Sequence, residues 1–499
     1  MKSELSHELA EMADRGESRG ADAVMTAARA DLNRSWVGFS PERRRTPGWV
    51  VAVGAAALVL VLVGGVALWS ALNPGIDAVS DDVVATTVPA PEVTVSTVAS
   101  PPTTVAETAT TAPTPTTQAP VVTVAETEPM DWSRVSLGAV AARGEMTTVI
   151  RGGPGLIAGG FASVDGDRVA AVWTSTDGST WERVPHDAAV FGGEDAHSIT
   201  GLAAGDTEYV AVGSSGRDGM AWTSVDGYVW ERVPQSASFV GEGWVKMTAV
   251  TYGPGAYVAV GYESEPDTDY MIDHGVVWVS PDGLTWDRVD SDLFVDQILL
   301  DDVAANDSGY VAVGLDWTPT PIHPGVWISE DGRTWDQVDL GDDEGARYMQ
   351  AVDATEDSIV AAGIYSPDLA MPEEAGDGSV VMWLSENATT WNRVPEDPEL
   401  IGAPRGAYTY GVTVSGDQIV AVGEFKPKSV ASSQAAAWVS NDAGSTWDHI
   451  ATPAETFGID ANALVIMRDV VVIDGVYVAV GVYDGETAVW NGLWNEEDG

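Results

Sequence analysis

Seven short apolar segments recur along the C-terminal part of the chain, and each ends in glycine. They are LIAGG at 156–160, YVAVG at 209–213, YVAVG at 257–261, YVAVG at 310–314, IVAAG at 359–363, IVAVG at 419–423 and YVAVG at 477–481. Short apolar runs between turn residues are typical of buried β-strands. Their spacing of about 50 residues lies in the range of propeller blades or solenoid units.

A second pattern follows each of the first six segments and predicts a β-hairpin. Its copies occupy residues 172–184, 221–233, 277–289, 326–338, 382–394 and 437–450. An Asp-Gly pair at the turn centre, such as Asp177-Gly178, is typical of tight hairpins. Each copy carries two Trp residues, such as Trp173 and Trp181, which we expect to pack between neighbouring units. A further apolar or alternating run precedes each glycine-ending segment, so each repeat predicts a four-stranded blade.

The two ends of the repeat region complement each other. The seventh repeat stops after the run VWNGLW at 489–494 and lacks an outer strand, whereas Trp132-Ser133-Arg134-Val135 matches Trp181-Glu182-Arg183-Val184. Pairing these ends would leave no long sheet edge free. We therefore predict an all-β, seven-bladed β-propeller over residues 131–499, with the N-terminal strand closing the last blade.

Residues 49–72 contain no charged side chain and predict a transmembrane helix. A helix of this length spans about 36 Å, which is enough to cross a bilayer core. Arg43, Arg44 and Arg45 precede it, and no Lys or Arg follows until Arg134. The positive-inside rule then places the N-terminus in the cytoplasm and the propeller outside the cell. A cleaved signal peptide, the alternative, would have a shorter apolar run nearer the N-terminus.

The segments on either side of this span differ in composition. Residues 1–48 predict a partly helical cytoplasmic tail, which either binds a partner or is simply polar. Residues 73–130 are rich in Thr, Pro, Ala and Val and contain no aromatic residue. Such a composition favours an extended, disordered linker that cannot bury a core.

Composition and charge limit the function. The chain has 75 acidic and 24 basic residues, a formal net charge of −51, and most of the excess lies in the repeat region. Such a surface repels phosphate backbones, so we expect no nucleic-acid partner. The chain has no Cys, which excludes disulfides, thiolate nucleophiles and thiolate metal ligands.

The hairpin turns resemble the Asp box, or BNR repeat, of sialidase-like propellers, whose pattern is Ser-x-Asp-x-Gly-x-Thr-Trp. Ser440, Asp442, Gly444, Thr446 and Trp447 match that spacing fully. In the fifth copy Asn387 and Ala388 replace Asp and Gly. Four shorter copies contain Ser175, Asp177, Gly178 and Trp181 in the first and Asp226, Asp282 and Asp331 in the next three. The resemblance implies that these turns lie away from any catalytic face, and such Asp residues typically accept backbone hydrogen bonds.

The same resemblance implies what a sialidase would need: three Arg, a Tyr–Glu pair and an Asp acid/base. The family's Arg-Ile-Pro motif is absent. The arginines near predicted inner strands are Arg151, Arg347, Arg405 and Arg468, with Tyr348 and Tyr408 close to two of them in sequence. Ordinary surface arginines are the alternative interpretation. If these arginines are dispersed, the enzyme hypothesis fails.

Acidic residues in the third repeat are candidate calcium ligands, because Ca²⁺ prefers oxygen donors. They are Glu265, Asp267, Asp269 and Asp273. Their spacing is not that of an EF-hand, and solvated loop charge is the alternative. The six His residues are scattered and no nucleotide-binding motif occurs, so no cofactor other than Ca²⁺ is expected.

These observations favour a cell-membrane protein whose extracellular propeller is a non-catalytic recognition or scaffold domain. Its ligand, a protein or a glycan, would bind on the loop face opposite the hairpin turns. Two alternatives stay open. One is a sialidase-like exo-glycosidase, and the other is a single-pass sensor that couples an external ligand to the cytoplasmic tail.

Overall fold

The structure is a computed structural model that describes residues 130–153, 155–264, 272–295, 297–317, 323–341, 346–366, 379–394, 407–425, 433–450 and 463–494. The predicted tail 1–48, span 49–72 and linker up to residue 129 lie outside these ranges. Within them, no helix combines the length and apolar character that a membrane crossing requires.

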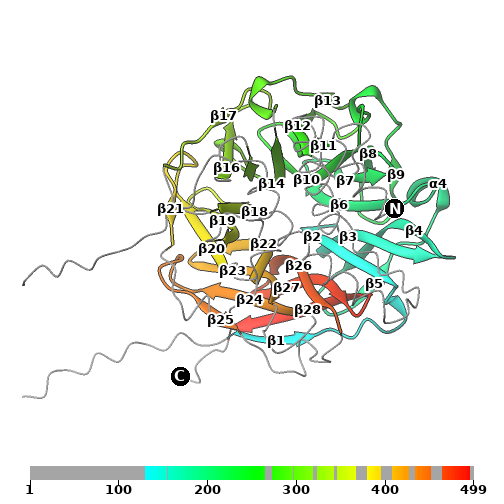
Figure 1. The fold of residues 1–499 in the computed structure, drawn as a ribbon. Helices are drawn as coiled ribbons and strands as arrows, with labels where there is room; N and C mark the ends of the chain where they lie inside the picture. The colour runs from blue at the N-terminus through cyan, green and yellow to red at the C-terminus, as the bar shows by residue number, and fades with distance from the viewer. Residues whose placement is uncertain are drawn as a thin grey trace, which may run out of the picture. The chain divides into compact units, whose positions relative to one another are not determined.

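Seven antiparallel sheets of four strands each form a ring (Figure 1). Within a blade the chain starts at the innermost strand and proceeds outward. Blades one to four hold β2 (Gly144–Gly152), β3 (Gly155–Val164), β4 (Asp167–Ser175) and β5 (Trp181–Arg183); β6 (His197–Ala204), β7 (Tyr209–Ser215), β8 (Asp218–Ser224) and β9 (Glu231–Arg232); β10 (Val245–Gly253), β11 (Ala256–Ser264), β12 (Ile272–Ser280) and β13 (Asp287–Arg288); β14 (Ile298–Asn306), β15 (Gly309–Asp316), β16 (His323–Ser329) and β17 (Asp336–Gln337).

The remaining three blades follow the same order. They hold β18 (Ala346–Ala354), β19 (Ile359–Ser366), β20 (Ser379–Ser385) and β21 (Asn392–Arg393); β22 (Ala407–Ser415), β23 (Gln418–Phe425), β24 (Gln434–Ser440) and β25 (Asp448–Ile450); β26 (Val465–Ile473), β27 (Val476–Tyr483), β28 (Glu486–Trp494) and finally β1 (Met130–Arg134). Short helical turns lie in the links that precede blades one to four: η1 (Gly138–Val140), α4 (Ala188–Phe191), η2 (Ala237–Phe239) and η3 (Asp292–Phe294).

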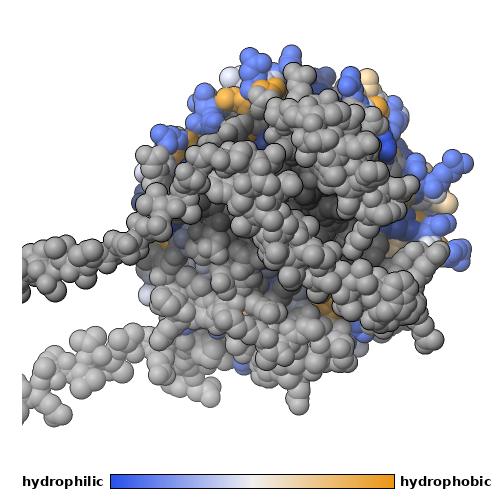
Figure 2. Space-filling view, viewed as in Figure 1, coloured by the Kyte–Doolittle hydropathy of each residue, from blue (hydrophilic) through white to orange (hydrophobic). Residues whose placement is uncertain are grey.

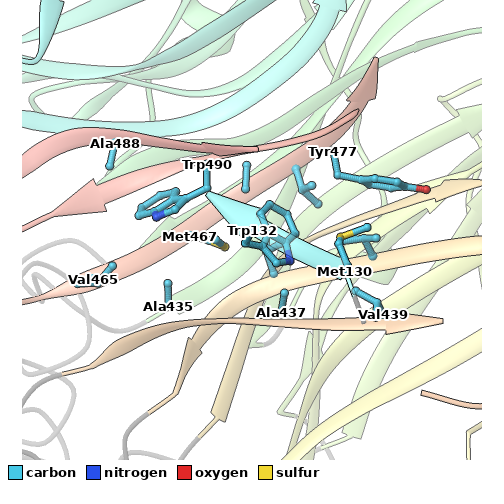
Figure 3. Close-up of a cluster of buried hydrophobic side chains, with 14 of the residues drawn as sticks. Met130, Trp132, Ala435, Ala437, Val439, Val465, Met467, Tyr477, Ala488 and Trp490 are labelled. Carbon is cyan, nitrogen blue, oxygen red and sulfur yellow. The ribbon is translucent and has the colours of Figure 1, made fainter. Parts of the chain in front are cut away.

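The ring is closed by the N-terminal strand, as the sequence predicts. β1 pairs antiparallel with β28, with Trp132 opposite Gly492 and Arg134 opposite Trp490. The strand begins at Met130, one residue before the predicted start of the propeller. Met130, Trp132 and Trp490 are buried in one cluster with side chains of blades six and seven (Figure 3). The all-β, seven-bladed propeller is therefore confirmed.

Tryptophans of the third strands fill the space between blades. Trp173 of blade one is fully buried and belongs to one cluster with Val478 and Val489 of blade seven. Equivalent clusters join the other neighbouring blades. Burying a large aromatic side chain contributes roughly 1.5–3 kcal/mol, so these contacts account for much of the stability of a chain without disulfides.

The glycine that ends each apolar segment is required by close backbone packing. A Cβ atom at Gly213 would lie 1.9 Å from the carbonyl oxygen of Ser198, and one at Gly481 would lie 2.0 Å from that of Ile466. No side chain fits at that distance. The glycines thus allow the second strand of each blade to approach the first, and the recurring sequence motif has a single steric cause.

The two faces of the ring differ. We call the side where the inner strands begin the loop face, and the opposite side the turn face. The antiparallel order places the turns between third and fourth strands on the turn face, beside the turns between first and second strands. A Cβ at Gly153 would lie 3.1 Å from the Asp226 carbonyl oxygen, which shows that the two kinds of turn meet. Hydrophilic side chains dominate the described part of the surface visible in Figure 2.

Candidate functional site at the inner ring

Every inner strand has a β-bulge at the same place. The pairing register with the second strand shifts there in all seven blades. A bulge re-aims the side chain of the extra residue, and such features often mark functional positions. Because the inner strands surround the ring axis (Figure 1), the seven bulge residues form a belt nearer the loop face. This bulge belt consists of Thr147, Thr200, Thr248, Asp301, Gln350, Tyr410 and Arg468.

The threonines of the belt connect blades one to four. Each hydroxyl donates a hydrogen bond to a backbone carbonyl of the following blade. The pairs are Thr147 Oγ1 to Ile199 O at 2.7 Å, Thr200 Oγ1 to Met247 O at 2.6 Å and Thr248 Oγ1 to Leu300 O at 2.8 Å. These contacts are neutral and satisfied, so this part of the inner ring serves architecture.

Carboxylates that follow the bulge residue also connect neighbouring blades, in blades four, five and seven. Each aspartate accepts one hydrogen bond from the next backbone N–H of its own strand and one from the following blade. The contacts between blades are Val352 N to Asp302 Oδ2 at 2.8 Å, Val414 N to Asp353 Oδ2 at 2.9 Å and Val149 N to Asp469 Oδ2 at 2.8 Å. The last of these joins blade seven to blade one, where the ring closes.

These carboxylates have raised pKa values. Burial raises the pKa of Asp302 and of Asp469 to about 7, and their backbone hydrogen bonds oppose this shift only in part. Burial raises the pKa of Asp353 as well. The charge of Asp353 contributes to the shift of Asp302, and that of Asp302 to the shift of Asp469. The acidic groups therefore interact with each other across the inner ring.

Two belt oxygens accept no hydrogen bond from any residue that the structure describes. They are Oδ2 of Asp301 in blade four and Oε1 of Gln350 in blade five, and both atoms are buried. Burial raises the pKa of the Asp301 carboxyl well above its usual value, and the charge of Lys246 opposes that shift. A buried acceptor without a donor costs roughly 1–3 kcal/mol. Neighbouring acceptors of this kind favour the binding of a donor-bearing group.

A charged cluster occupies the belt between blades six, seven and one. Arg468 Nε forms an ion pair with Glu145 Oε1, and its guanidinium carbon lies 4.5 Å from the centroid of the Tyr410 ring. The Tyr410 hydroxyl donates to Glu424 Oε1 at 3.0 Å. Burial and the nearby Glu424 charge raise the pKa of Tyr410 well above its usual value. The phenol therefore stays protonated and acts as a donor.

The predicted arginines do not converge as a set. Arg468 lies in the belt, and Arg347 is buried near the start of β18 with its guanidinium carbon 4.6 Å from the centroid of the Tyr365 ring. Arg151 lies near the opposite end of β2, toward the turn face, and its Nε donates to Val472 O. Arg405 lies outside the described residues.

The two predicted tyrosines are core residues near the loop face. Tyr348 packs against Leu299 and Leu315, and Tyr408 is buried in β22. Sequence reasoning missed Tyr410, Asp301 and Gln350. A signal for them existed, because each belt residue precedes the strand-ending glycine of its blade by the same number of positions.

The candidate calcium ligands belong to the third blade, between the end of β11 and the first residues of β12. Glu265, Asp267 and Asp269 lie outside the described residues, and only the backbone of Asp273 is described. Among the described residues, no group of three or more His, Asp or Glu side chains is placed to hold a metal ion.

The hairpin turns use their side chains for local hydrogen bonds. In the first turn Ser175 Oγ accepts from Gly178 N at 2.9 Å, and Asp177 Oδ1 accepts from the Thr180 N–H at 2.7 Å. Trp181 Nε1 donates to Gly178 O at 2.9 Å. The backbone hydrogen bonds lower the pKa of the Asp177 carboxyl.

The other five turns repeat this pattern. Hydrogen bonds from backbone N–H groups are accepted by the side chains of Asp226, Asp282, Asp331, Asn387 and Asp442. Trp447 Nε1 likewise donates to Gly444 O. Ala388 replaces glycine in the fifth turn yet adopts a φ of 61°. These residues hold the turns on the face opposite to the start of the inner strands.

No protein-family model matches the chain, and no curated protein sequence matches it. Solved structures with similar folds include YCF48 bound to D1 peptide, with 13% identity and a TM-score of 0.45 over 74% of this chain and 97% of that chain. The WD40 propeller domain of Doa1 has 9% identity and a TM-score of 0.44, covering 74% and 98%. The phage phi92 endosialidase has 8% identity and a TM-score of 0.40, covering 74% and 70%.

Proposed function

We propose that the propeller is a non-catalytic recognition domain that binds a protein or glycan ligand at the loop-face side of the bulge belt. The observation that carries this proposal is the pair of buried side-chain oxygens, Asp301 Oδ2 and Gln350 Oε1, which lie in adjacent blades and have no hydrogen-bond partner among the described residues. Hydroxyl, amide or ammonium groups of a ligand would supply the missing donors. The acidic residues Asp302, Asp353 and Asp469 favour a ligand that is neutral or positively charged there.

The non-catalytic part of the proposal rests on how the reactive groups are engaged. Arg468 is paired with Glu145, and the protonated Tyr410 hydroxyl is bound to Glu424. Arg151 lies toward the turn face, so it is remote from any group of arginines that could bind a substrate at the loop face. Groups that neutralise one another stabilise the ring and leave little charge for transition-state binding.

The cellular placement follows from the sequence and remains part of the proposal. Residues 49–72 would anchor the chain in the cell membrane with the propeller outside. β1 is the outermost strand of its blade and runs from the turn face to the loop face. The chain therefore enters the propeller at the turn face, and the loop face would be the one turned away from the anchor.

Screening the full-length protein in detergent on arrays of glycans and of peptides tests the proposal. The double variant D301A/Q350A removes both acceptors, and we expect binding of the selected ligand to weaken by about 100-fold, as for hot-spot residues. The variant T200V, which alters the belt on another blade, serves as the matched control. Equal binding by wild type and D301A/Q350A would reject the site.

A sialidase-like exo-glycosidase is the second candidate function. The position of Arg151 toward the turn face counts against it, whereas the Tyr410–Glu424 hydrogen bond next to Arg468 favours it. In that reaction the Glu424 carboxylate would accept the Tyr410 proton as the phenol oxygen attacks the sugar, because the phenol is otherwise protonated. The assay is release of a fluorescent aglycone from a sialoside, and Y410F should abolish turnover. The absence of turnover in the wild-type protein would exclude this candidate.

A further inference from the structure

The six hairpin turns on the turn face form an internal comparison, because they share one backbone design but differ in their exposed residues. In blade one these positions are Thr176, Ser179 and Thr180, and in blade four they are Glu330, Arg333 and Thr334. Blade two instead has Val225, Tyr228 and Val229, with relative exposures of 70%, 46% and 65%.

The apolar residues of blade two are not needed to form the turn. Asp226 Oδ1 accepts from the N–H groups of Tyr228 and Val229 at 2.8 Å each, as Asp177 does in blade one. Val229 lacks a hydroxyl and therefore cannot make a side-chain hydrogen bond that other turns contain. The hydroxyls of the equivalent threonines donate to the aspartate carboxylate: Thr180 at 3.4 Å, Thr334 at 3.4 Å and Thr446 at 2.7 Å.

A further exposed apolar side chain lies on the neighbouring turn, in blade three. Leu284 in the next turn has a relative exposure of 48%. This turn packs on blade two close to the blade-two turn, because a Cβ at Gly283 would lie 2.6 Å from Val210 and 3.3 Å from Thr223, which is the second residue before Val225. We call Val225, Tyr228, Val229 and Leu284 the turn patch. Clustered exposed apolar side chains with no role in the fold are typical of interaction surfaces.

Charge at the turn patch selects the kind of partner. The carboxylates of Asp226 and Asp282 lie within the two turns, and backbone hydrogen bonds from Val229 and Thr285 hold them. The formal charge of the chain is −51, so a second copy would bring like charge to an acidic surface. A partner segment that combines apolar side chains with Lys or Arg complements both features.

We propose that the turn patch docks a basic segment of another protein, whose apolar side chains pack on Val225, Tyr228, Val229 and Leu284. The site lies on the face opposite to the proposed ligand site, and it does not depend on that proposal. A propeller with both sites bridges a loop-face ligand and a turn-face partner.

The sharpest variant grafts the blade-one turn onto blade two as V225T/Y228S/V229T. The graft keeps Ser224, Asp226, Gly227 and Trp230, which make the turn, and adds a threonine hydroxyl next to Asp226. It should therefore fold. The matched control E330T/R333S makes the same turn sequence in blade four and removes no apolar side chain.

The probe is a peptide library displayed on phage, in which apolar positions are combined with either basic or acidic positions, selected on the full-length protein. We expect enrichment of the basic peptides, weakening with added salt, and a loss of at least about tenfold in affinity in the graft but not in the control. Equal binding by the graft, enrichment of acidic peptides, or no enrichment would overturn the proposal.

Two further outcomes would also overturn it by identifying another occupant. Self-association in sedimentation equilibrium that the graft abolishes would assign the turn patch to a second copy. Binding to phosphatidylcholine vesicles that the graft abolishes would assign it to a lipid surface. The loop-face variant D301A/Q350A should leave peptide binding unchanged, so failure of one proposal is distinguishable from failure of the other.

Discussion

Inner-strand side chains connect each blade to the next by hydrogen bonds that run in opposite directions in two groups of blades. The first group is blades one to three, and the second is blades four, five and seven. In the first group a threonine hydroxyl donates to a carbonyl of the next blade, as Thr248 does to Leu300. In the second group a carboxylate accepts from an N–H of the next blade, as Asp469 does from Val149. We call these the threonine half and the acidic half. The fold accepts either kind of hydrogen bond, so the carboxylates of the acidic half are not required by the architecture, and the proposed ligand site lies beside them.

The largest expected difference between the halves concerns stability. Asp469→Ala leaves the N–H groups of Val149 and Val470 without their acceptor where the ring closes. We expect a loss of about 3 kcal/mol in the free energy of unfolding, since each unsatisfied buried group costs roughly 1–3 kcal/mol. Urea denaturation of the full-length protein measures it. A smaller loss of unfolding free energy than in a threonine variant would contradict the role of Asp469 in joining blades seven and one.

The second difference concerns pH. Asp302 and Asp469 have pKa values near 7 in the folded protein, above the ordinary value of 3.8. The folded state therefore binds these protons more tightly, and the stabilisation is full below the ordinary pKa and is lost as pH rises through about 7. As the pH rises between these two values, the free energy of unfolding should fall less in D302N/D469N than in the wild type. If the free energy of unfolding changed equally with pH in both proteins, the two carboxyls would have ordinary pKa values in the folded state.

The third difference is a smaller stability effect in the threonine half. Thr248→Val keeps the shape of the side chain and removes the hydrogen bond to Leu300 O. We expect a loss of about 1 kcal/mol, the usual contribution of one neutral hydrogen bond, with no dependence on pH. The same urea titration measures it, and a pH-dependent loss would break the distinction between the halves.

The smallest stability effect is expected at the unsatisfied acceptors. Because Asp301 Oδ2 and Gln350 Oε1 have no donor among the described residues, removing them should not weaken the unliganded ring. We expect D301A/Q350A to keep the wild-type midpoint of thermal unfolding or to raise it by a few degrees. A clear decrease would show that these side chains serve the fold.

The architecture could be predicted from the sequence because each repeated residue has one structural cause. Gly213 and its equivalents avoid a backbone clash, and Trp173 and its equivalents fill the space between blades. The partial repeat around Trp132 revealed how the ring closes. Residues that have the same structural role in every blade recur at regular spacing, and this spacing can be recognised in the sequence.

The bulge belt left a pattern of spacing alone, because its residues recur at a fixed distance before the strand-ending glycine but differ in side chain. Thr248, Asp301, Gln350, Tyr410 and Arg468 occupy equivalent positions but share no chemistry, and the inner strands are recognisable only as apolar or alternating runs. A bulge depends on pairing geometry, which side-chain periodicity does not encode. Of the arginines singled out from the sequence, Arg468 lies in the belt, whereas Arg151 lies toward the other face.

The most direct test of the central claim compares ligand binding between the halves. The full-length wild type, D301A/Q350A from the acidic half and T200V/T248V from the threonine half are applied to the same glycan and peptide arrays. We expect the first variant to lose about 100-fold in affinity for the selected ligand and the second to retain it. Loss of binding in T200V/T248V with full binding by D301A/Q350A would contradict it.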